Sequence, residues 1–74
     1  MIYSKPILQL TTELLPNASI KEIFGCHSVT DMNGDLIGFV DGYFYLNEDY
    51  RHGRSVYERF LNSGVEVKVY KNKL

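Results

Sequence analysis

The 74-residue sequence lacks tryptophan and contains one cysteine, two prolines and no long hydrophobic run. A single thiol, Cys26, cannot form an internal disulfide, so no such cross-link is available to stabilise a domain this small. No apolar segment approaches the roughly 20 residues that a membrane span requires. Residues 1–6 lack the basic and apolar regions of a secretory signal. We therefore expect a cytoplasmic protein that does not enter a membrane.

A strong excess of charge of either sign is also missing. Eight basic and nine acidic residues give a formal net charge of -1. This balance argues against a strongly basic protein that coats nucleic acid and against a strongly acidic mimic of DNA. The charges are distributed unevenly along the chain. Acidic residues outnumber basic ones in residues 1–49, and basic residues outnumber acidic ones in residues 50–74. Such asymmetry indicates either a basic binding surface or two halves that mix in the folded domain.

Residues that carry chemistry are few. The sequence has no paired-cysteine motif, no histidine cluster and no glycine-rich phosphate loop, so we expect neither a metal nor a cofactor. Cys26 and His27 are neighbours in a predicted strand, where adjacent side chains point to opposite faces and cannot form a catalytic pair. A small hydrolase or nuclease built on His27, Asp31 and His52 is kept as a third interpretation.

The residues that are present favour one small domain of the α+β class that spans residues 1–74. Apolar residues make up 45% of the chain, which is typical of a folded protein and exceeds the content of disordered segments. Aromatic residues make up 14%, including six tyrosines. We expect some of these rings to lie at a surface.

The N-terminal region allows two interpretations. Pro6 suits the first turn of a helix that ends at Leu15. Apolar residues at helical spacing would form one face of that helix; they are Ile7, Leu10 and Leu14. Alternatively, residues 2–10 form an edge strand, where a proline is tolerated. We prefer the helix and leave the edge strand open.

A second, short helix is predicted from Ser19 to Phe24. Ser19 and Glu22 have the spacing of a capping box, in which each side chain accepts a hydrogen bond from the backbone N–H of the other. Gly25 then suits the left-handed residue that ends a helix.

The middle of the chain is predicted to form an antiparallel meander of three strands. Asn33-Gly34 and Asp41-Gly42 are the two strongest turn signals in the sequence. They separate predicted strands at residues 26–31, 35–40 and 43–47.

The lengths of the two turns predict the register of these strands. A three-residue loop, Met32–Gly34, with a left-handed Gly34, places Val29 opposite Ile37. A two-residue turn at the second site pairs Phe39 with Phe44. The predicted buried face consists of Ile37, Phe39, Phe44 and Leu46. The predicted opposite face consists of Gly38, Val40, Tyr43 and Tyr45.

A helix and a last strand complete the predicted fold. Asn47 is a candidate helix cap, and the regular helix is expected to begin near Arg54 because Gly53 weakens the first turn. Alternating valines predict a final strand at residues 65–70. The strand count makes it parallel to the first and third strands of the meander. The expected result is a mixed four-stranded sheet with a helix on one face.

The tyrosines and arginines indicate a binding protein. The candidate partner-binding residues are Tyr43, Tyr45, Arg51, Arg54, Arg59 and Tyr70. Tyrosine and arginine are enriched in the hot spots of protein interfaces, and they also stack on and neutralise single-stranded nucleic acid.

Because the net charge is close to zero, we favour a non-enzymatic accessory protein that binds and modulates, and most simply inhibits, a larger protein. Small accessory proteins of phages and mobile elements are similar in size and composition alone. A nucleic acid is the second candidate partner, and a homodimer is left open.

Overall fold

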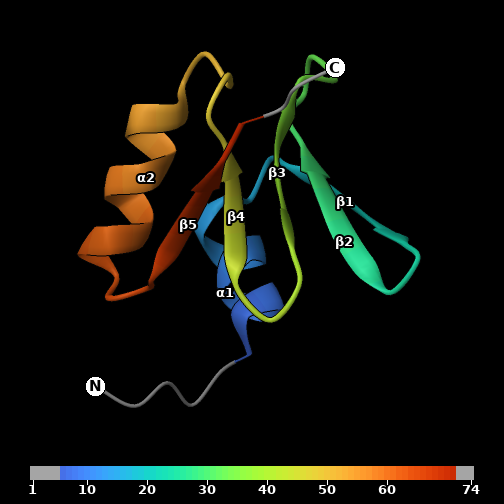
Figure 1. Ribbon diagram of the computed structural model, residues 1–74, viewed down its shortest axis with the longest axis horizontal. Helices are drawn as coiled ribbons and strands as arrows, with labels where there is room; N and C mark the ends of the chain where they lie inside the picture. The colour runs from blue at the N-terminus through green and yellow to red at the C-terminus, as the bar shows by residue number, and fades with distance from the viewer. Residues whose placement is uncertain (1–5, 72–74) are drawn as a thin grey trace.

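The computed structural model describes residues 6–71 as two helices and a five-stranded mixed sheet (Figure 1). In chain order the elements are α1 (Ile7–Leu14), β1 (Ser19–Ile23), β2 (Cys26–Thr30), β3 (Leu36–Val40), β4 (Phe44–Asn47), α2 (Gly53–Asn62) and β5 (Val67–Tyr70). The strands lie in the order β1-β2-β3-β4-β5. The first four are antiparallel to their neighbours, and β5 is parallel to β4. The predicted α+β class is confirmed, with one strand more than expected.

The helix preferred for the N-terminal region is present as α1. Pro6 precedes it in an extended conformation, with φ of -66° and ψ of 155°. Thr11 is fully buried on this helix, and its hydroxyl donates a hydrogen bond to the Ile7 carbonyl at 2.8 Å, so the buried oxygen is not left unpaired. The alternative edge strand is wrong for residues 7–10, and its first residues, 2–5, lie outside the described range.

The predicted helix from Ser19 to Phe24 is wrong, because this segment forms strand β1. All five of its residues pair with β2, from Ser19 opposite Thr30 to Ile23 opposite Cys26. The capping box is a local signal, whereas pairing satisfies the backbone groups of the whole segment and places Ile20 opposite a buried residue of β2. Gly25 is left-handed, as expected, but within a hairpin turn.

The register of the β3–β4 hairpin differs from the prediction by one residue. Val40 pairs with Phe44 and Phe39 pairs with Tyr45, across a three-residue loop closed by a hydrogen bond from the Asp41 N–H to the Tyr43 carbonyl. The predicted Phe39–Phe44 pair is therefore wrong. A shift of one residue exchanges the two faces of a strand, and the observed register buries Val40 and moves Phe39 to the outer face.

A bulge in β3 explains a second difference from the prediction. Val29 lies opposite Gly38 instead of Ile37, and the next paired residue of β3 is Leu36, so Ile37 is an extra residue. The bulge allows Ile37 and Val40, which are three positions apart, to face the same core. Gly38 has no space for a side chain, because a Cβ atom would overlap the backbone carbonyl of Tyr45.

The predicted loop Met32–Gly34 between β2 and β3 is confirmed. Gly34 has a φ of 87°, and the Asp31 N–H donates to the Asp35 carbonyl at 2.9 Å across the loop. Its three-residue length was thus correct, and only the bulge displaced the pairing of Val29.

The helix and the last strand follow the prediction closely. Helix α2 begins at Gly53, and β5 is parallel to β4 as expected. Asn47, however, does not cap the helix, since His52 occupies that position. The Asn47 side chain is buried, donates to the Leu36 carbonyl and accepts from the Asp49 N–H. It therefore ties β3 to the loop that leads into α2.

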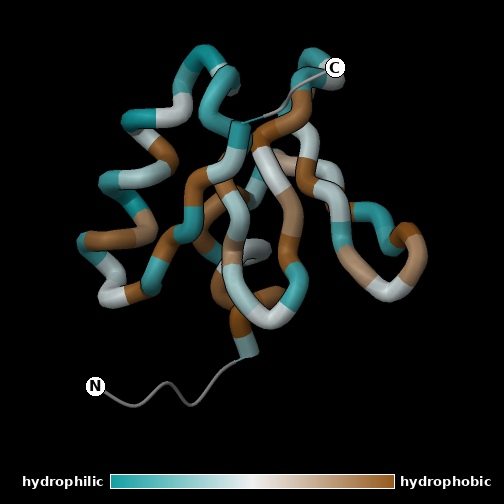
Figure 2. Tube along the Cα trace, in the orientation of Figure 1, coloured by the Kyte–Doolittle hydropathy of each residue, from teal (hydrophilic) through white to brown (hydrophobic). Residues whose placement is uncertain are grey.

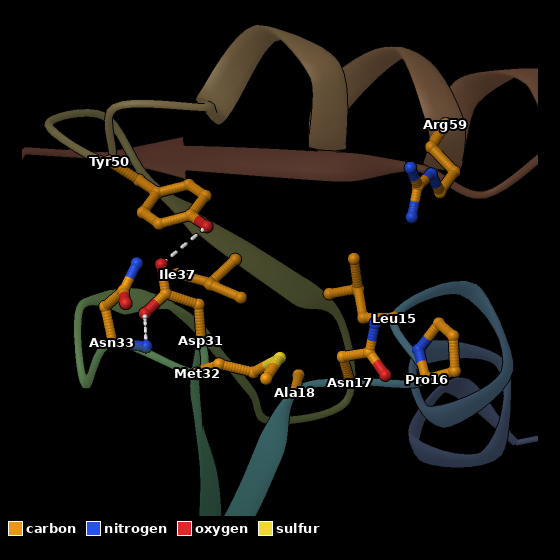
Figure 3. Close-up of a pocket in the computed structure, with 10 residues that line it drawn as sticks. All are labelled: Leu15, Pro16, Asn17, Ala18, Asp31, Met32, Asn33, Ile37, Tyr50 and Arg59. Carbon is orange, nitrogen blue, oxygen red and sulfur yellow. Dashed lines mark hydrogen bonds between the residues drawn. The ribbon is translucent and has the colours of Figure 1, made fainter.

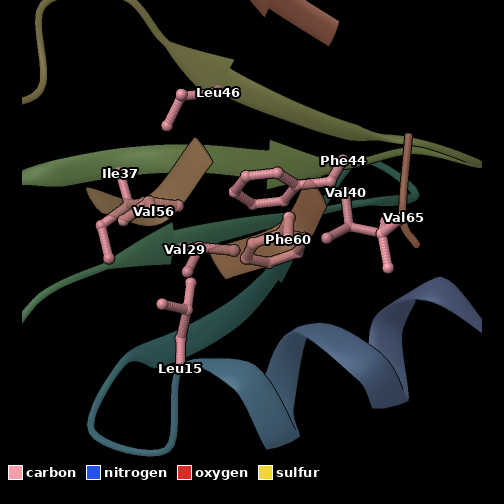
Figure 4. Packing of buried hydrophobic residues seen from close by; sticks show 9 residues of the cluster. All are labelled: Leu15, Val29, Ile37, Val40, Phe44, Leu46, Val56, Phe60 and Val65. Carbon is pink, nitrogen blue, oxygen red and sulfur yellow. The ribbon is translucent and has the colours of Figure 1, made fainter. Parts of the chain in front are cut away.

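The core lies between one face of the sheet and both helices (Figure 4). It consists of Leu15, Val29, Ile37, Val40, Phe44, Leu46, Val56, Phe60 and Val65. The rings of Phe44 and Phe60 are fully buried and stack with centroids 4.2 Å apart. Figure 2 shows apolar and polar positions interspersed along the sheet, and in β5 two valines alternate with Lys68 and Tyr70, as expected for a strand with one buried face.

Two matched substitutions test the register of β3 and β4. Phe44→Ala is expected to lower the free energy of unfolding by about 3–5 kcal/mol, because it empties the centre of the core. Phe39→Ala removes only ring contacts on the outer face and is expected to cost about 1–2 kcal/mol. Urea denaturation of both variants provides the measurement, and equal losses would contradict the observed register.

Candidate functional site

Four aromatic rings form a continuous array on the outer face of the sheet, which we call the aromatic face. Its members are Phe39, Tyr43, Tyr45 and Tyr70. Both helices of residues 6–71 contribute to the core on the opposite face, so no described helix covers these rings (Figure 1). An uncovered aromatic sheet face is unusual in a small domain and is a candidate interaction surface.

Ring-to-ring contacts hold this array in place. Phe39 stacks on Tyr45 with centroids 5.2 Å apart, and the tilted ring of Tyr70 also contacts Phe39, with centroids 5.0 Å apart. Tyr43 meets Tyr45 edge to face at 6.5 Å and has 47% of its surface exposed. The ammonium group of Lys68 lies 4.6 Å from the centre of the Tyr43 ring. The rings are thus preorganised before any partner binds.

The charge around the aromatic face is balanced. Lys68 lies 3.8 Å from the Glu66 carboxylate, and both side chains are exposed. Lys21 lies opposite Ser28, which projects from the outer face. The negative charge of Asp41 is close enough to Cys26, on the same face, to raise the pKa of its thiol. Among the charged residues named here, which all lie within residues 6–71, two cations are therefore accompanied by two anions.

The structure separates the predicted binding residues into two groups. The three tyrosines lie together on the aromatic face, as described above. Arg51 and Arg54 line a shallow groove between α2 and β5, beside Tyr57 and Val69. Arg59 lies on the helical side, where its guanidinium donates to the Leu14 carbonyl at 2.9 Å. The arginines therefore do not surround the tyrosines.

Sequence reasoning missed Phe39 as a member of this surface. The sequence predicts Phe39 in the core, because the two-residue turn expected after Val40 is one residue shorter than the observed loop. Alternation along the strand then gave it the wrong face. Lys68 is placed next to Tyr43 by the parallel pairing of β5 with β4, in which Lys68 lies opposite Tyr45.

The Tyr70 hydroxyl group is the buried polar group of this face that lacks a hydrogen bond within the described residues. Burial also raises the pKa of Tyr70. A buried hydroxyl without a partner costs about 1–3 kcal/mol, so the hydroxyl does not contribute to the stability of the isolated fold.

Cys26 lies at the start of β2 on the outer face. Desolvation raises the pKa of its thiol, and the charge of Asp41 and a hydrogen bond with that carboxylate raise it further. A thiol in this setting is a weak nucleophile at neutral pH.

A cavity of about 280 Å³ lies on the opposite side, between the loop after α1, the β2–β3 loop and α2 (Figure 3). Leu15 and Ile37 provide apolar walls. Asp31 accepts 2.9 Å hydrogen bonds from the Tyr50 hydroxyl and from the backbone N–H groups of Asn33 and Asp35. The charged groups lining this cavity, Asp31 and the Arg59 described above, are therefore already engaged within the fold.

The residues considered for a hydrolase do not converge on one point. His27 lies near the start of β2 and Asp31 directly follows its end, so the two are separated by roughly 13 Å at about 3.3 Å per residue. His52 is close enough to help lower the pKa of Asp31. Within residues 6–71, no group of three or more histidine, cysteine or acidic side chains is arranged to hold a metal ion.

Neither helix of the described range has the length and hydrophobicity needed to cross a membrane. Comparison with protein-family models, with curated proteins and with solved structures gave no match to this chain. The function is therefore argued from the surfaces of the molecule itself.

The Asp31–Tyr50 hydrogen bond predicts a pH dependence. Burial raises the pKa of Asp31, but the hydrogen bonds from Asp35, Tyr50 and Asn33, together with the nearby His52, outweigh burial and hold the pKa below its usual value. The stability contributed by ionised Asp31 is therefore present above the unfolded pKa of about 3.9 and is lost as the pH falls through the lower folded value. Carboxyl NMR titration of Tyr50→Phe should show a higher Asp31 pKa than in the parent.

The environment of Cys26 predicts slow thiol chemistry. Modification by a disulfide reagent should be slower than for an unfolded peptide at pH 7, because the raised pKa leaves less thiolate. Asp41→Asn removes the negative charge and should accelerate modification. An equal rate in the parent and in this variant would exclude the carboxylate as a cause of the shift.

Proposed function

We propose that this chain is a small non-enzymatic accessory protein that binds and inhibits a larger protein through its aromatic face. The observation that carries the proposal is the array of four contacting rings on a sheet face that no described helix covers. Aromatic side chains contribute most to the binding energy of protein interfaces when they enter a desolvated centre. A reduced Cys26 is consistent with a cytoplasmic site of action.

The rigidity of the aromatic face supports tight binding. A tyrosine has few rotatable bonds, and each ring here is already held by a neighbouring ring. Ordering the side chains at an interface normally costs free energy, and a preorganised surface lowers this cost. Three of the four rings are carried by the strands β3, β4 and β5, which position them on a hydrogen-bonded frame.

The placement of charge favours a protein partner over a nucleic acid. A site for single-stranded nucleic acid combines stacked rings with a positively charged groove that follows the backbone. Here the cation nearest the rings, Lys68, lies beside Glu66, and the arginines are on other surfaces. Rings whose nearby lysine lies beside a carboxylate, with the arginines elsewhere, fit a protein surface that offers apolar and polar groups better than a chain of phosphates.

Two double variants separate these partners. Tyr43→Ser with Tyr45→Ser should weaken binding to the purified protein partner about 30-fold or more, because it removes two central contacts. Arg51→Glu with Arg54→Glu should change that affinity by less than about threefold, and affinity should depend only weakly on salt. Isothermal titration at several salt concentrations measures both effects, with melting curves to establish that each variant is folded.

A nucleic-acid partner would produce the opposite pattern. Affinity for an RNA or single-stranded DNA oligonucleotide would be high at physiological ionic strength and would fall steeply with salt, and the glutamate variant would fail for every oligonucleotide. That result, or self-association that buries the aromatic face in a homodimer, would overturn the proposal.

A further inference from the structure

Phe24 is the most exposed large apolar residue among those described. It lies at the tip of the β1–β2 hairpin, with 100% of its surface accessible. The preceding residue, Ile23, is 45% exposed. Full exposure means that Phe24 packs against nothing in the fold, so its ring contributes no burial to stability.

The backbone of Phe24 is also unfavourable for its residue type. Phe24 has a φ of 51° and is the one non-glycine residue with positive φ in the described range. Ile23 pairs with Cys26, so the turn contains two residues, and both must adopt left-handed conformations. Asparagine is preferred at the first of these positions, whereas a bulky side chain is strained there. A residue that is both strained and fully exposed indicates a role outside the fold.

The topology places Phe24 at the same end of the sheet as Tyr43. His27 pairs with Val40, so the β1–β2 turn and the β3–β4 loop, which contains Tyr43, lie at the same end of the sheet. Figure 1 shows both connections at the lower end of the molecule. The outer face measures about 19 Å across five strands and about 17 Å along them, which gives an area of about 320 Å². This area is small compared with the roughly 800 Å² that each partner buries in a standard interface. A projecting side chain at this end would enlarge the contact.

We propose that Phe24 is an anchor that inserts into an apolar pocket of the protein partner bound by the aromatic face. This inference rests on the proposed function and adds the chemistry of the partner, which must offer a pocket for one aromatic ring next to a surface for the tyrosines. The hairpin carries Lys21 and Glu22, whose charges cancel. A membrane-binding tip would instead need several basic residues around the apolar one, so a protein pocket is favoured.

The first test needs no partner. Phe24→Asn replaces the strained residue by the type that the turn prefers. We expect the melting temperature to rise by about 4–8 °C, because the substitution relieves backbone strain and removes no packing. A lower melting temperature would show that Phe24 stabilises the fold and would overturn its role as an external anchor.

The second test identifies the contact and measures it. A photoreactive benzoyl-phenylalanine at position 24 should cross-link one protein in the native cell, and the same protein should be captured from position 45. Titration of that purified protein should show that Phe24→Asn weakens binding about tenfold or more. Met32→Ser is the matched control, because Met32 is 80% exposed at a loop at the other end of the sheet, and its affinity should stay within about twofold of the parent.

The outcomes distinguish the anchor from the proposed function. Parent-like affinity of Phe24→Asn, with weak binding of the Tyr43 and Tyr45 variant, overturns the anchor alone. Parent-like affinity of both variants overturns both proposals. Phe24-dependent binding to vesicles of phosphatidylcholine and phosphatidylserine would assign the tip to a membrane. Phe24-dependent dimerisation in sedimentation experiments would assign it to a second copy of this chain, and either result would replace the proposed pocket.

Discussion

The stacked rings of Phe44 and Phe60 determine which side of the central strands faces the core. Phe44 is fully buried against α2, so the neighbouring residue on β4, Tyr45, must point to the other side. The pairing of β4 with β3 fixes the orientation of β3 as well, because Val40 lies opposite Phe44 and Phe39 lies opposite Tyr45. One buried aromatic contact thus places two rings of the aromatic face, Phe39 and Tyr45, on the outer side of the sheet, where both are half-buried.

Two irregularities in β3 make this arrangement compatible with a continuous core. The extra residue at Ile37 changes the alternation, so that apolar side chains on both sides of the bulge point inward. Gly38 then allows the backbone of β4 to approach closely, since any side chain would meet the Tyr45 carbonyl. The bulge and the glycine together permit the central strands to bury their inner side chains while the other face of the sheet collects aromatic rings.

The separation of the rings from the arginines gives the surface its chemical character. Basic residues are frequent in the second half of the chain, yet Arg59 is used to hold the end of α1 and two other arginines line a groove beside β5. The aromatic face is left with balanced charge. Binding at such a surface depends on shape and on desolvation of rings, with little contribution from long-range attraction.

Much of the fold follows from signals within a few residues. The Asn33-Gly34 turn, the helical spacing in α1 and α2 and the alternating valines before Tyr70 each indicated the correct element, because backbone preference and local periodicity act over short distances. The tyrosine content predicts a binding surface; the structure brings Tyr43, Tyr45 and Tyr70 together, and their role in binding stays a proposal.

Contacts between segments far apart in the sequence decided the remaining features, which are strand β1, the register of β3 and the position of the arginines. Strand β1 forms because residues 19–23 pair with β2, and no local pattern outweighed the capping box that suggested a helix there. The face on which Phe39 lies depends on a single residue in the length of one loop, and the core selects that length by burying Val40. The position of the arginines away from the tyrosines depends on how α2 packs beside the sheet. Sequence thus determined the elements and the residue types available for binding, whereas packing determined register, and register determined which side chains share a surface.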